Sequence, residues 1–529
     1  MAAGPAAARV TPGRRQQRVA LRPCTVARYS HPGAEDVNVH PEFQVVTGRD
    51  RRALVALLPA LLVTACGPTV IVSDAAPSPP ASLAPAPSRE GPIRLLIDSD
   101  MAADDIGAIA SLLREPAVEV VGITVAGTGE AHCPGGLYSA RALVTALASG
   151  PIPVACGRGA ALGPAQAFPE EWRTGADAGY GINLPAPAMP PDSRSAAQLI
   201  VDLASAGDRP LTILTIGPLT NLAMALLLDP ALPGRIDRVV AMAGAVGVPG
   251  NVAPPEGEAG PPTAEWNLHA DPTAAAEVFA AGLDLTLVPL DATNDVPLDA
   301  DFISELEVDH VAAPADIVFE LYARNSFLVT GEPMLWDSIA AMTLLHPEVV
   351  SVREARVRVV QGDGLDGGRT IEDPAGARVV AATGADPVLF RKLLFAALRR
   401  GAPRPDPFTA TVIIRVQAGA STCEARIEPP APRAGIVRLD GAGLPDGEVQ
   451  ITAFALGEWT WAELEAFAAQ PVFGENTRPI ETIATVGLKP GAAGTAYGEG
   501  AAGPFGVACL TGTFEAPVIR LTGPFQMAP

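Results

Sequence analysis

Four carboxylates lie within residues 98–105, whose sequence DSDMAADD directly follows the apolar stretch of residues 93–97. Carboxylates packed this closely repel one another, and the repulsion costs free energy unless a cation neutralises it. Clusters of carboxylate oxygens are the ligands that Ca²⁺ and Mg²⁺ require in proteins. The segment therefore predicts a hard-metal site at the end of a β-strand.

The elements that must position this site alternate along the chain between residues 93 and 400. Apolar strand-like segments are predicted at residues 94–97, 118–125, 211–215, 238–242 and 285–289. Helix-like segments are predicted at residues 104–114, 139–148, 195–205, 219–228 and 272–281. This alternation predicts an α/β fold, with a mostly parallel open sheet that carries helices on both faces.

Unusual polar or glycine-rich segments follow several of the predicted strands. The acidic segment follows the first strand, and residues 127–128, 217–221 and 242–244 follow later strands. Because ligands of open α/β sheets bind outside the carboxyl ends of the strands, we expect these segments to meet on one edge. Taken alone, Asp104 and Asp105 have a second explanation, since acidic residues are also favoured at a helix N-terminus.

Residues 93–397 resemble the nucleoside hydrolase family, which includes inosine/uridine-preferring and purine-preferring N-ribohydrolases. The run DSDMAADD is similar to the family signature D-x-D-x-x-x-D-D. Further family blocks follow in family order, namely IGPLTNLAMAL, VVAMAGAV, PGN, AEWNLHADPTAA and VPLDAT. The resemblance implies a Ca²⁺-dependent enzyme that hydrolyses the N-glycosidic bond of ribonucleosides.

The same resemblance implies a role for each matching residue. Asp100 would be the general base and a calcium ligand, and Asp98 would orient the loop. Asp105, Asp337 and the backbone carbonyl of Ile216 would complete the calcium ligands. The residues that would bind the substrate are Asp104, Met242, Asn251, Glu265, Asn267, Trp172 and Trp336. Outside this ordered set of family blocks, Met242 would be interpreted as a core residue. Asn251, Glu265 and Asn267 would be interpreted as ordinary polar residues of a loop.

These residue types suit glycosidic bond cleavage. Breaking the bond to C1′ builds positive charge on the ribose ring, and nearby carboxylates stabilise that charge. Calcium lowers the pKa of a bound water, and a carboxylate such as Asp100 can remove its proton. Hydrogen bonds to the ribose hydroxyls fix the reactive geometry.

Two tryptophans bear on the choice of base. Many family members carry His immediately before the late calcium-binding Asp, whereas this chain has Trp336 there. With Trp172 upstream, this pattern resembles the purine-preferring branch, in which two aromatic faces hold the base. We therefore expect inosine, adenosine and guanosine to be preferred over uridine, although both tryptophans could also be core residues. Thr128, Ala243 and the long loop 251–265 depart from the family pattern and could lower activity.

The N-terminal part is expected to be an export signal and a tether. Residues 1–52 are interpreted as an extension upstream of the true start. Residues 53–66, preceded by two arginines and ending in VTAC, resemble a bacterial lipoprotein signal with its lipobox. By that resemblance Cys66 would be lipidated and would anchor the exported protein to the outer face of the cell membrane; a buried helix or a short membrane span is the alternative. Residues 67–92, rich in Pro, Ala and Ser, predict an extended tether.

The other parts of the chain are less specific. Residues 93–402 are expected to form the catalytic domain, and residues 403–529 a β-rich domain of unknown role. Outside the cytosol Cys133–Cys156 and Cys423–Cys509 could form disulfides, but free buried thiols would fit the sequence as well. The formal net charge of −21 argues against nucleic acid and anionic membrane surfaces as partners. The expected partner is a small nucleoside, and the family implies a homo-oligomer.

Two other functions also fit the acidic segment. A nucleoside-binding lipoprotein without catalysis would use the same residues. A phosphatase of the haloacid-dehalogenase type also places D-x-D after its first strand, but Met101-Ala102 and the adjacent Asp104-Asp105 argue against it. Release of free ribose would separate these alternatives from a hydrolase.

Overall fold

The computed structural model covers the whole chain. It describes residues 81–82 and 91–529, except 149, 208, 255–259, 326–327, 329–332, 420, 470, 472–479 and 514–515. The predicted signal, Cys66 and most of the tether lie outside the described residues. Among the residues that are described, no helix is both long and apolar enough to cross a bilayer.

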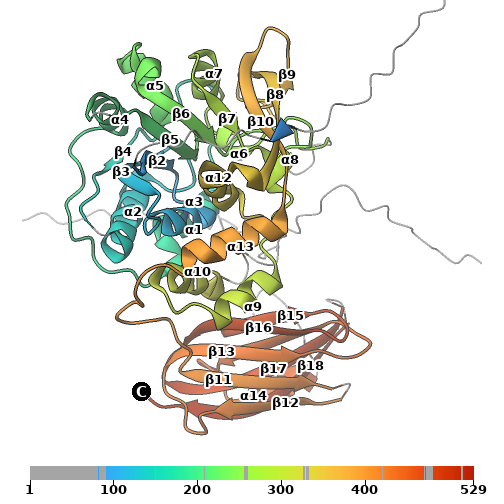
Figure 1. Ribbon diagram of the computed structural model, residues 1–529. Helices are drawn as coiled ribbons and strands as arrows, with labels where there is room; N and C mark the ends of the chain where they lie inside the picture. The colour runs from blue at the N-terminus through green and yellow to red at the C-terminus, as the bar shows by residue number, and fades with distance from the viewer. Residues whose placement is uncertain are drawn as a thin grey trace, which may run out of the picture. The chain divides into compact units, whose positions relative to one another are not determined.

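A large sheet forms the centre of the N-terminal fold (Figure 1). Its strands follow the order β1-β8-β10-β7-β6-β5-β2-β3-β4, and β9 pairs with β8. The run from β10 to β4 is parallel throughout, whereas β8 pairs antiparallel with β1, β9 and β10. Their bounds are β1 Ala81–Ser82, β2 Ile93–Ser99, β3 Val118–Val125, β4 Val154–Cys156, β5 Leu211–Ile216, β6 Ile236–Ala241, β7 Leu285–Leu287, β8 Val350–Val359, β9 Thr370–Glu372 and β10 Ala377–Ala385. The predicted mostly parallel sheet is thus confirmed.

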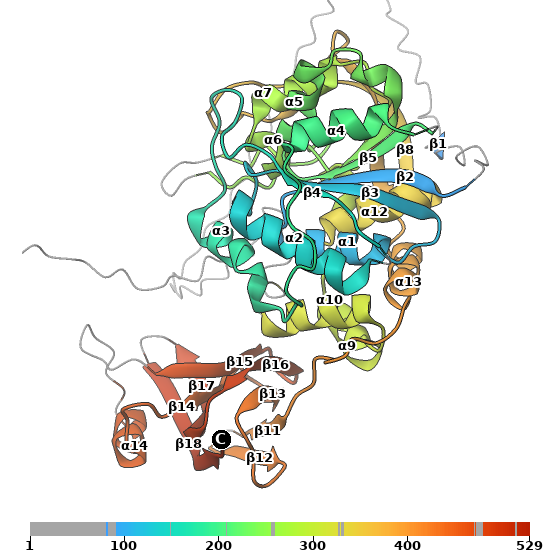
Figure 2. The same ribbon diagram turned by 90° about the vertical axis from the view of Figure 1, so that its left-hand side faces the viewer.

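Helices cover both faces of this sheet, because successive strand side chains point to opposite sides. On β2, Leu95 and Ile97 belong to one buried cluster, while Leu96 between them belongs to the other. Figures 1 and 2 show α4, α5 and α7 on one face and α1, α2 and α12 on the other. The helix bounds are α1 Ala103–Leu112, α2 Cys133–Leu147, α3 Glu170–Asp177, α4 Ala196–Ser205, α5 Thr220–Leu228, α6 Trp266–His269, α7 Pro272–Ala280, α8 Leu290–Thr293, α9 Ala300–Val308, α10 Ala313–Arg324, α12 Trp336–Leu345 and α13 Pro387–Leu398.

The largest boundary error concerns α2, which begins at Cys133 rather than at residue 139. Pro134 is compatible with this start, because a proline in the first helical turn lacks only an N–H that has no intrahelical partner. Gly136 also packs so closely that an added Cβ would lie 2.9 Å from Cγ1 of Val125. Close packing against β3 therefore explains a glycine inside this helix.

The C-terminal part consists of two four-stranded sheets, as the predicted β-rich region requires. One has the order β12-β11-β13-β16 and the other β15-β14-β17-β18. The strands are β11 Val412–Ala418, β12 Cys423–Glu428, β13 Gly435–Ala442, β14 Val449–Ala455, β15 Glu481–Leu488, β16 Ala493–Gly500, β17 Gly503–Thr513 and β18 Ala516–Met527, with the helix α14 at Trp461–Ala469. Their buried side chains form one shared cluster, so the sheets make a sandwich.

Both cysteine pairs form disulfides, which decides between the two alternatives that the sequence left open. Cys133 at the start of α2 bonds to Cys156 at the end of β4. Cys423 of β12 bonds to Cys509 of β17, so this disulfide joins the two sheets of the sandwich.

Candidate active site

The acidic segment makes a tight turn between β2 and α1. Met101 in this turn has a φ of 61°, a left-handed conformation that is costly for a side chain with a Cβ. The hydroxyl of Ser99 donates to Oδ1 of Asp105, and the backbone N–H of Asp100 reaches the same oxygen at 3.2 Å. The N–H of Met101 donates to Oγ of Ser99 at 3.0 Å. These bonds fold the turn back on itself and hold Asp105 against the end of β2.

Three carboxylates converge where the first turns of α1 and α12 meet. Side-chain oxygens of Asp104, Asp105 and Asp337 lie within 4.8 Å of one another. The backbone N–H of Asp337 donates to Oδ2 of Asp104 at 3.3 Å. Asp105 is fully buried, and its Oδ2 has no hydrogen-bond partner in the described part of the chain. A distant helix therefore completes the site, as the sequence motif around Asp337 implied.

Burial of these acids raises their pKa values. It raises the pKa of Asp104 to about 6, with a further contribution from the charge of Asp100. The pKa values of Asp105 and Asp337 rise well above the usual range, first through burial and then through the neighbouring carboxylates. Burial likewise raises the pKa of Asp100. A set of oxygen donors, in which one buried carboxylate oxygen has no partner within the described part of the chain, fits a hard divalent cation.

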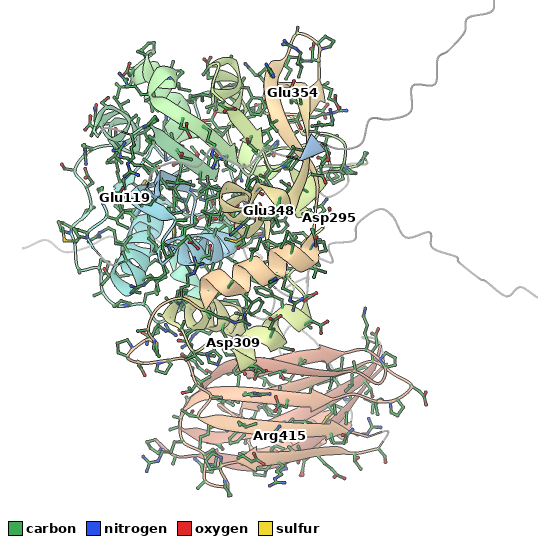
Figure 3. The ribbon with its side chains drawn as sticks, viewed as in Figure 1. Glu119, Asp295, Asp309, Glu348, Glu354 and Arg415 are labelled. Atoms are coloured by element: carbon green, nitrogen blue, oxygen red, sulfur yellow. A yellow bond between two sulfur atoms is a disulfide. The ribbon has the colours of Figure 1, made fainter. Side chains whose placement is uncertain are left out.

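Acidic side chains at the surface differ from this cluster. Glu119 and Glu354, labelled in Figure 3, are exposed and each pairs with an arginine. The partner of Glu119 is Arg209, and Glu354 accepts from Arg378 at 2.6 Å. No such ion pair with a basic side chain occurs for Asp105 or Asp337 among the described residues. A bound cation would supply the missing positive charge.

Backbone atoms of two other segments pack closely against Asp100. Its Oδ2 accepts a hydrogen bond from the backbone N–H of Glu130 at 2.9 Å. A Cβ on Gly217 would lie 2.8 Å from the Asp100 nitrogen, so only glycine fits there. Ile216, the predicted carbonyl ligand, ends β5 and is in register with Ser99 of β2. The register of the parallel sheet thus brings Ile216 beside the acidic segment.

Asp98 and its partner Asn221 brace this region. Oδ1 of Asp98 accepts from the hydroxyl of Thr124 at 2.6 Å and from Nδ2 of Asn221 at 2.8 Å. Burial nevertheless raises the pKa of Asp98 to about 7. Asp98 thus joins the end of β2 to β3 and α5. Asn221 was not a predicted site residue; its position in GPLTN, directly after a strand, was the available signal.

Four of the predicted substrate residues lie together beyond β6, namely Met242, Asn251, Glu265 and Asn267, whereas Asp104 is in the first turn of α1. Nδ2 of Asn267 donates to the carbonyl oxygen of Met242 at 3.1 Å, and Oδ1 of Asn251 accepts from the backbone N–H of Trp266 at 3.1 Å. Glu265 caps α6, and its two oxygens accept from the backbone N–H groups of Asn267 at 2.8 Å and Gly244 at 3.0 Å. Burial raises the pKa of Glu265 to about 7. The carboxylate of Glu265 therefore holds the backbone after β6 next to the start of α6.

An aromatic cluster stands beside these residues. Trp266 stacks on Phe168 at a centroid distance of 4.8 Å and meets Trp172 edge-on at 5.5 Å. Trp336, the first residue of α12, is half-buried, and its indole N–H is buried without a partner among the described residues. Trp266 was not a predicted site residue; its place between Glu265 and Asn267 was the available signal.

Two more residues near Asp100 were not predicted. Glu130 accepts from the hydroxyl of Tyr180 at 2.5 Å. Burial and the charge of Asp100 raise the pKa of Glu130 to about 8. Neither residue belongs to a matching family block, so the motifs gave no signal for them. Thr128, which departs from the family pattern, bonds to Thr220 at 2.8 Å between the two hydroxyl oxygens.

The carboxylate cluster at the end of β2 can hold a metal ion, and the polar side chains beyond β6 offer hydrogen bonds to a bound ligand. The family model of inosine-uridine preferring nucleoside hydrolases matches residues 95–418. The pyrimidine-specific ribonucleoside hydrolase RihB of Escherichia coli (strain K12 / DH10B) is 30% identical over 292 residues, covering 54% of this chain and 88% of that protein. The probable uridine nucleosidase 1 of Oryza sativa subsp. japonica is 29% identical over 285 residues, covering 53% of this chain and 85% of that protein.

Solved structures show the same fold. The inosine-uridine preferring nucleoside hydrolase from Bacillus anthracis superposes with a TM-score of 0.51 at 24% identity, covering 58% of this chain and 99% of that one. The chain therefore belongs to the inosine-uridine preferring nucleoside hydrolase family. It is a ribonucleoside hydrolase, an enzyme that cleaves N-glycosyl bonds. Family members generally hold a metal ion in the active site, which agrees with the carboxylate cluster described above.

Proposed function

We propose that this enzyme is a Ca²⁺-dependent hydrolase that prefers purine ribonucleosides and releases free base and ribose. The observation that carries the proposal is the buried cluster of Asp104, Asp105 and Asp337, which lies next to Asp100 and is completed by a helix that begins with a tryptophan. The cluster supports the metal, and the tryptophans support the preferred base.

Calcium is the cation that we propose for the cluster. Ca²⁺ accepts six to eight oxygen ligands in flexible geometry, from carboxylates and backbone carbonyls alike. Asp100, Asp105, Asp337 and the carbonyl of Ile216 would hold it. When bound, the cation supplies positive charge that lowers the pKa of water at the site.

The protein side chains then divide the work. The carboxylate of Asp100 takes the proton from the attacking water. Asp104, Asn251, Glu265 and Asn267 hold the ribose hydroxyls and fix the reacting geometry. As the bond to the base breaks, the surrounding carboxylates stabilise the positive charge on the ribose ring.

The preference for purines rests on the aromatic side chains. Trp172 and Trp336 would enclose the base, and Trp266 backs Trp172 at 5.5 Å. A flat bicyclic base offers more stacking area than a pyrimidine and can leave without a side-chain acid at position 336. The related proteins named above carry pyrimidine and uridine names, so uridine is the competing substrate in the test.

We also propose that the protein is exported and anchored by a lipid at Cys66. Two disulfides support an oxidising compartment, because such bonds are rare in the reducing cytosol. Metabolic labelling with a fatty acid should mark the wild type and leave Cys66→Ser unlabelled. Equal labelling of both proteins would refute the anchor.

The central experiment measures free ribose released by the full chain from inosine, adenosine, guanosine and uridine. We expect faster release from the purine nucleosides, loss of release with a calcium chelator, and recovery when Ca²⁺ is restored. Asp100→Asn should lower kcat at least about 100-fold, since it removes the base. Faster release from uridine would overturn the purine preference, and release that withstands chelation would overturn the calcium requirement.

A further inference from the structure

The loop between β3 and α2, residues 126–132, lies directly against Asp100. The N–H of Glu130 donates to Oδ2 of Asp100. The N–H of the next residue, Ala131, donates to the carbonyl oxygen of Asp100 at 2.9 Å. A Cβ on Gly129 would lie only 2.2 Å from Cβ of Asp100, so the backbone itself touches this residue. Any movement of the loop therefore moves the N–H that orients the Asp100 carboxylate.

The opposite side of this loop is held by the segment 170–181, which contains α3. The hydroxyl of Tyr180 donates to Oε1 of Glu130 at 2.5 Å. The buried guanidinium of Arg173 donates to the carbonyl oxygen of Gly127 at 3.0 Å. At the far end of the loop, Asp177 accepts from the backbone N–H of His132 at 2.7 Å and contacts its Nδ1 at 2.8 Å. Segment and loop are thus joined at three places.

Tyr180 is fixed in a conformation that needs such support. Its φ of 51° is left-handed, between Gly179 at 57° and Gly181 at 68°. A non-glycine residue in this region costs about 1–3 kcal/mol and persists only where the surroundings enforce it. Tyr180 is buried, and its carbonyl oxygen accepts from Nδ2 of Asn325 at 2.9 Å. The turn therefore presents the phenol to Glu130 from a rigid base.

We propose that Tyr180 and Glu130 are positioning residues that hold the Asp100 carboxylate in its reactive orientation and connect it to the segment carrying Trp172. The inference rests on the proposed role of Asp100 as general base. Neither residue has to contact the substrate: Tyr180 fixes the side chain of Glu130, and the backbone of Glu130 fixes Asp100. A base misplaced by about 1 Å can slow the reaction about 100-fold without changing substrate binding.

The test is a set of matched substitutions in the full chain, assayed by ribose release. Tyr180→Phe removes only the donor, Glu130→Ala removes the acceptor, and Glu130→Gln keeps an acceptor oxygen. Tyr138→Phe, on the exposed face of α2, is the matched control. We expect Tyr180→Phe and Glu130→Ala each to lower kcat about 10- to 100-fold, with KM within about threefold of the wild type.

Two further outcomes distinguish a positioning pair from general destabilisation. The double variant Tyr180→Phe/Glu130→Ala should lose no more activity than either single variant, because the two residues act as one unit. Glu130→Gln and Tyr138→Phe should stay near wild-type kcat, and Glu130→Gln keeps the test open should Tyr180→Phe fail to fold.

Contrary results are equally specific. Wild-type kcat in Tyr180→Phe, independent losses in the double variant, or a change confined to KM would overturn the inference. Full turnover by Asp100→Asn would overturn the proposed base and, with it, this inference. Loss in Tyr180→Phe alongside loss in Asp100→Asn supports both.

Discussion

At the scale of single residues, the site shows how burial and charge create a need for a cation. Asp105 is fully buried, one of its oxygens has no partner among the described residues, and Asp337 lies close to two more carboxylates. Such a group of acids is stable only when protonated or when neutralised by a bound ion. The chemistry and the stability of the site are therefore linked.

This linkage predicts how pH changes the free energy of unfolding of the protein when a chelator has removed the metal. Folding raises the pKa of Asp98 from 3.8 to about 7 and that of Asp104 from 3.8 to about 6. When the pKa of a carboxyl is higher in the folded state than in the unfolded state, protonation stabilises the folded state. This contribution to the free energy of unfolding is complete below the pKa of the unfolded state, and it is lost as the pH rises through the pKa of the folded state. In chelator, the free energy of unfolding should fall between pH 4 and about pH 7.

Urea unfolding at several pH values, with chelator or with excess Ca²⁺, measures this effect. Added Ca²⁺ should stabilise the protein more at pH 7.5 than at pH 5, because the ligands must be deprotonated to bind it (about one proton is displaced for each group still protonated). Equal stabilisation at both values would contradict a carboxylate metal site.

Trp336 carries a second prediction at this scale. Trp336→Ala should lower turnover of inosine much more than it lowers the affinity for Ca²⁺, because the indole would stack on the base while Asp337 beside it would hold the cation. The matched variant Trp459→Ala, in the C-terminal sandwich, should leave both quantities unchanged. Unchanged inosine turnover in Trp336→Ala would refute the two-sided aromatic site.

At the scale of elements, the parallel sheet and its connections bring the chemistry together. Ser99 of β2 is in register with both Val125 of β3 and Ile216 of β5, so the segments after these three strands start at the same level. The helices α1 and α12 then aim their first turns, and with them Asp105 and Asp337, at that edge. The tight turn after β2 thus places Asp100, Asp104 and Asp105 at this edge.

The disulfide between α2 and β4 gives an element-scale prediction. It closes a loop with a sequence separation of 23, for which the chain-entropy model gives a stabilisation of about 3 kcal/mol. Cys133→Ser/Cys156→Ser should lower the free energy of unfolding of the N-terminal fold by that order. Urea unfolding followed by tryptophan fluorescence would measure it.

The control for this experiment is Cys423→Ser/Cys509→Ser, which removes the other disulfide from the sandwich. This variant should leave ribose release near the wild-type rate. If instead only the sandwich variant lowered the stability of the N-terminal fold, the assignment of the two disulfides to separate folds would be wrong.

At the scale of the whole molecule, the segment that follows α13 packs against the catalytic fold beyond residue 402, where the sequence predicted that this fold ends. Arg404 is buried and donates to Oε2 of Glu320 at 2.7 Å and to the carbonyl oxygen of Asn183 at 3.0 Å, and it also pairs with Asp316. The backbone N–H of Phe408 reaches Asp316 at 3.2 Å. A boundary at residue 403, as predicted, would separate Arg404 from two buried carboxylates.

This arrangement predicts the cost of removing Arg404. Arg404→Ala should lower the free energy of unfolding by about 1–3 kcal/mol, because it removes one buried charged donor from Asp316 and Glu320, which keep His310 and Arg324 as their other side-chain partners. Arg378→Ala, which breaks the exposed pair with Glu354, should have no measurable effect. Chemical denaturation of the two variants would measure both changes, and equal small losses would show that Arg404 is dispensable.

Much of this protein follows from the sequence alone. Apolar strands alternating with helices predict the parallel sheet, since each strand must bury both faces. The acidic run predicts a metal site, because four carboxylates within eight residues require a cation. Asp337 was found through its motif, although its place beside Asp105 depends on α12 returning to the edge of the sheet.

Only the tertiary structure decided the rest, because it depends on contacts between segments far apart in the chain. Glu130 and Tyr180 are separated by 50 residues and carry no motif, yet they share a hydrogen bond beside Asp100. Trp266 joins Trp172 only when α6 and α3 meet, and the cysteine pairs were undecided until the strands were placed. Local sequence specifies elements and their chemistry, whereas packing chooses which distant side chains act together.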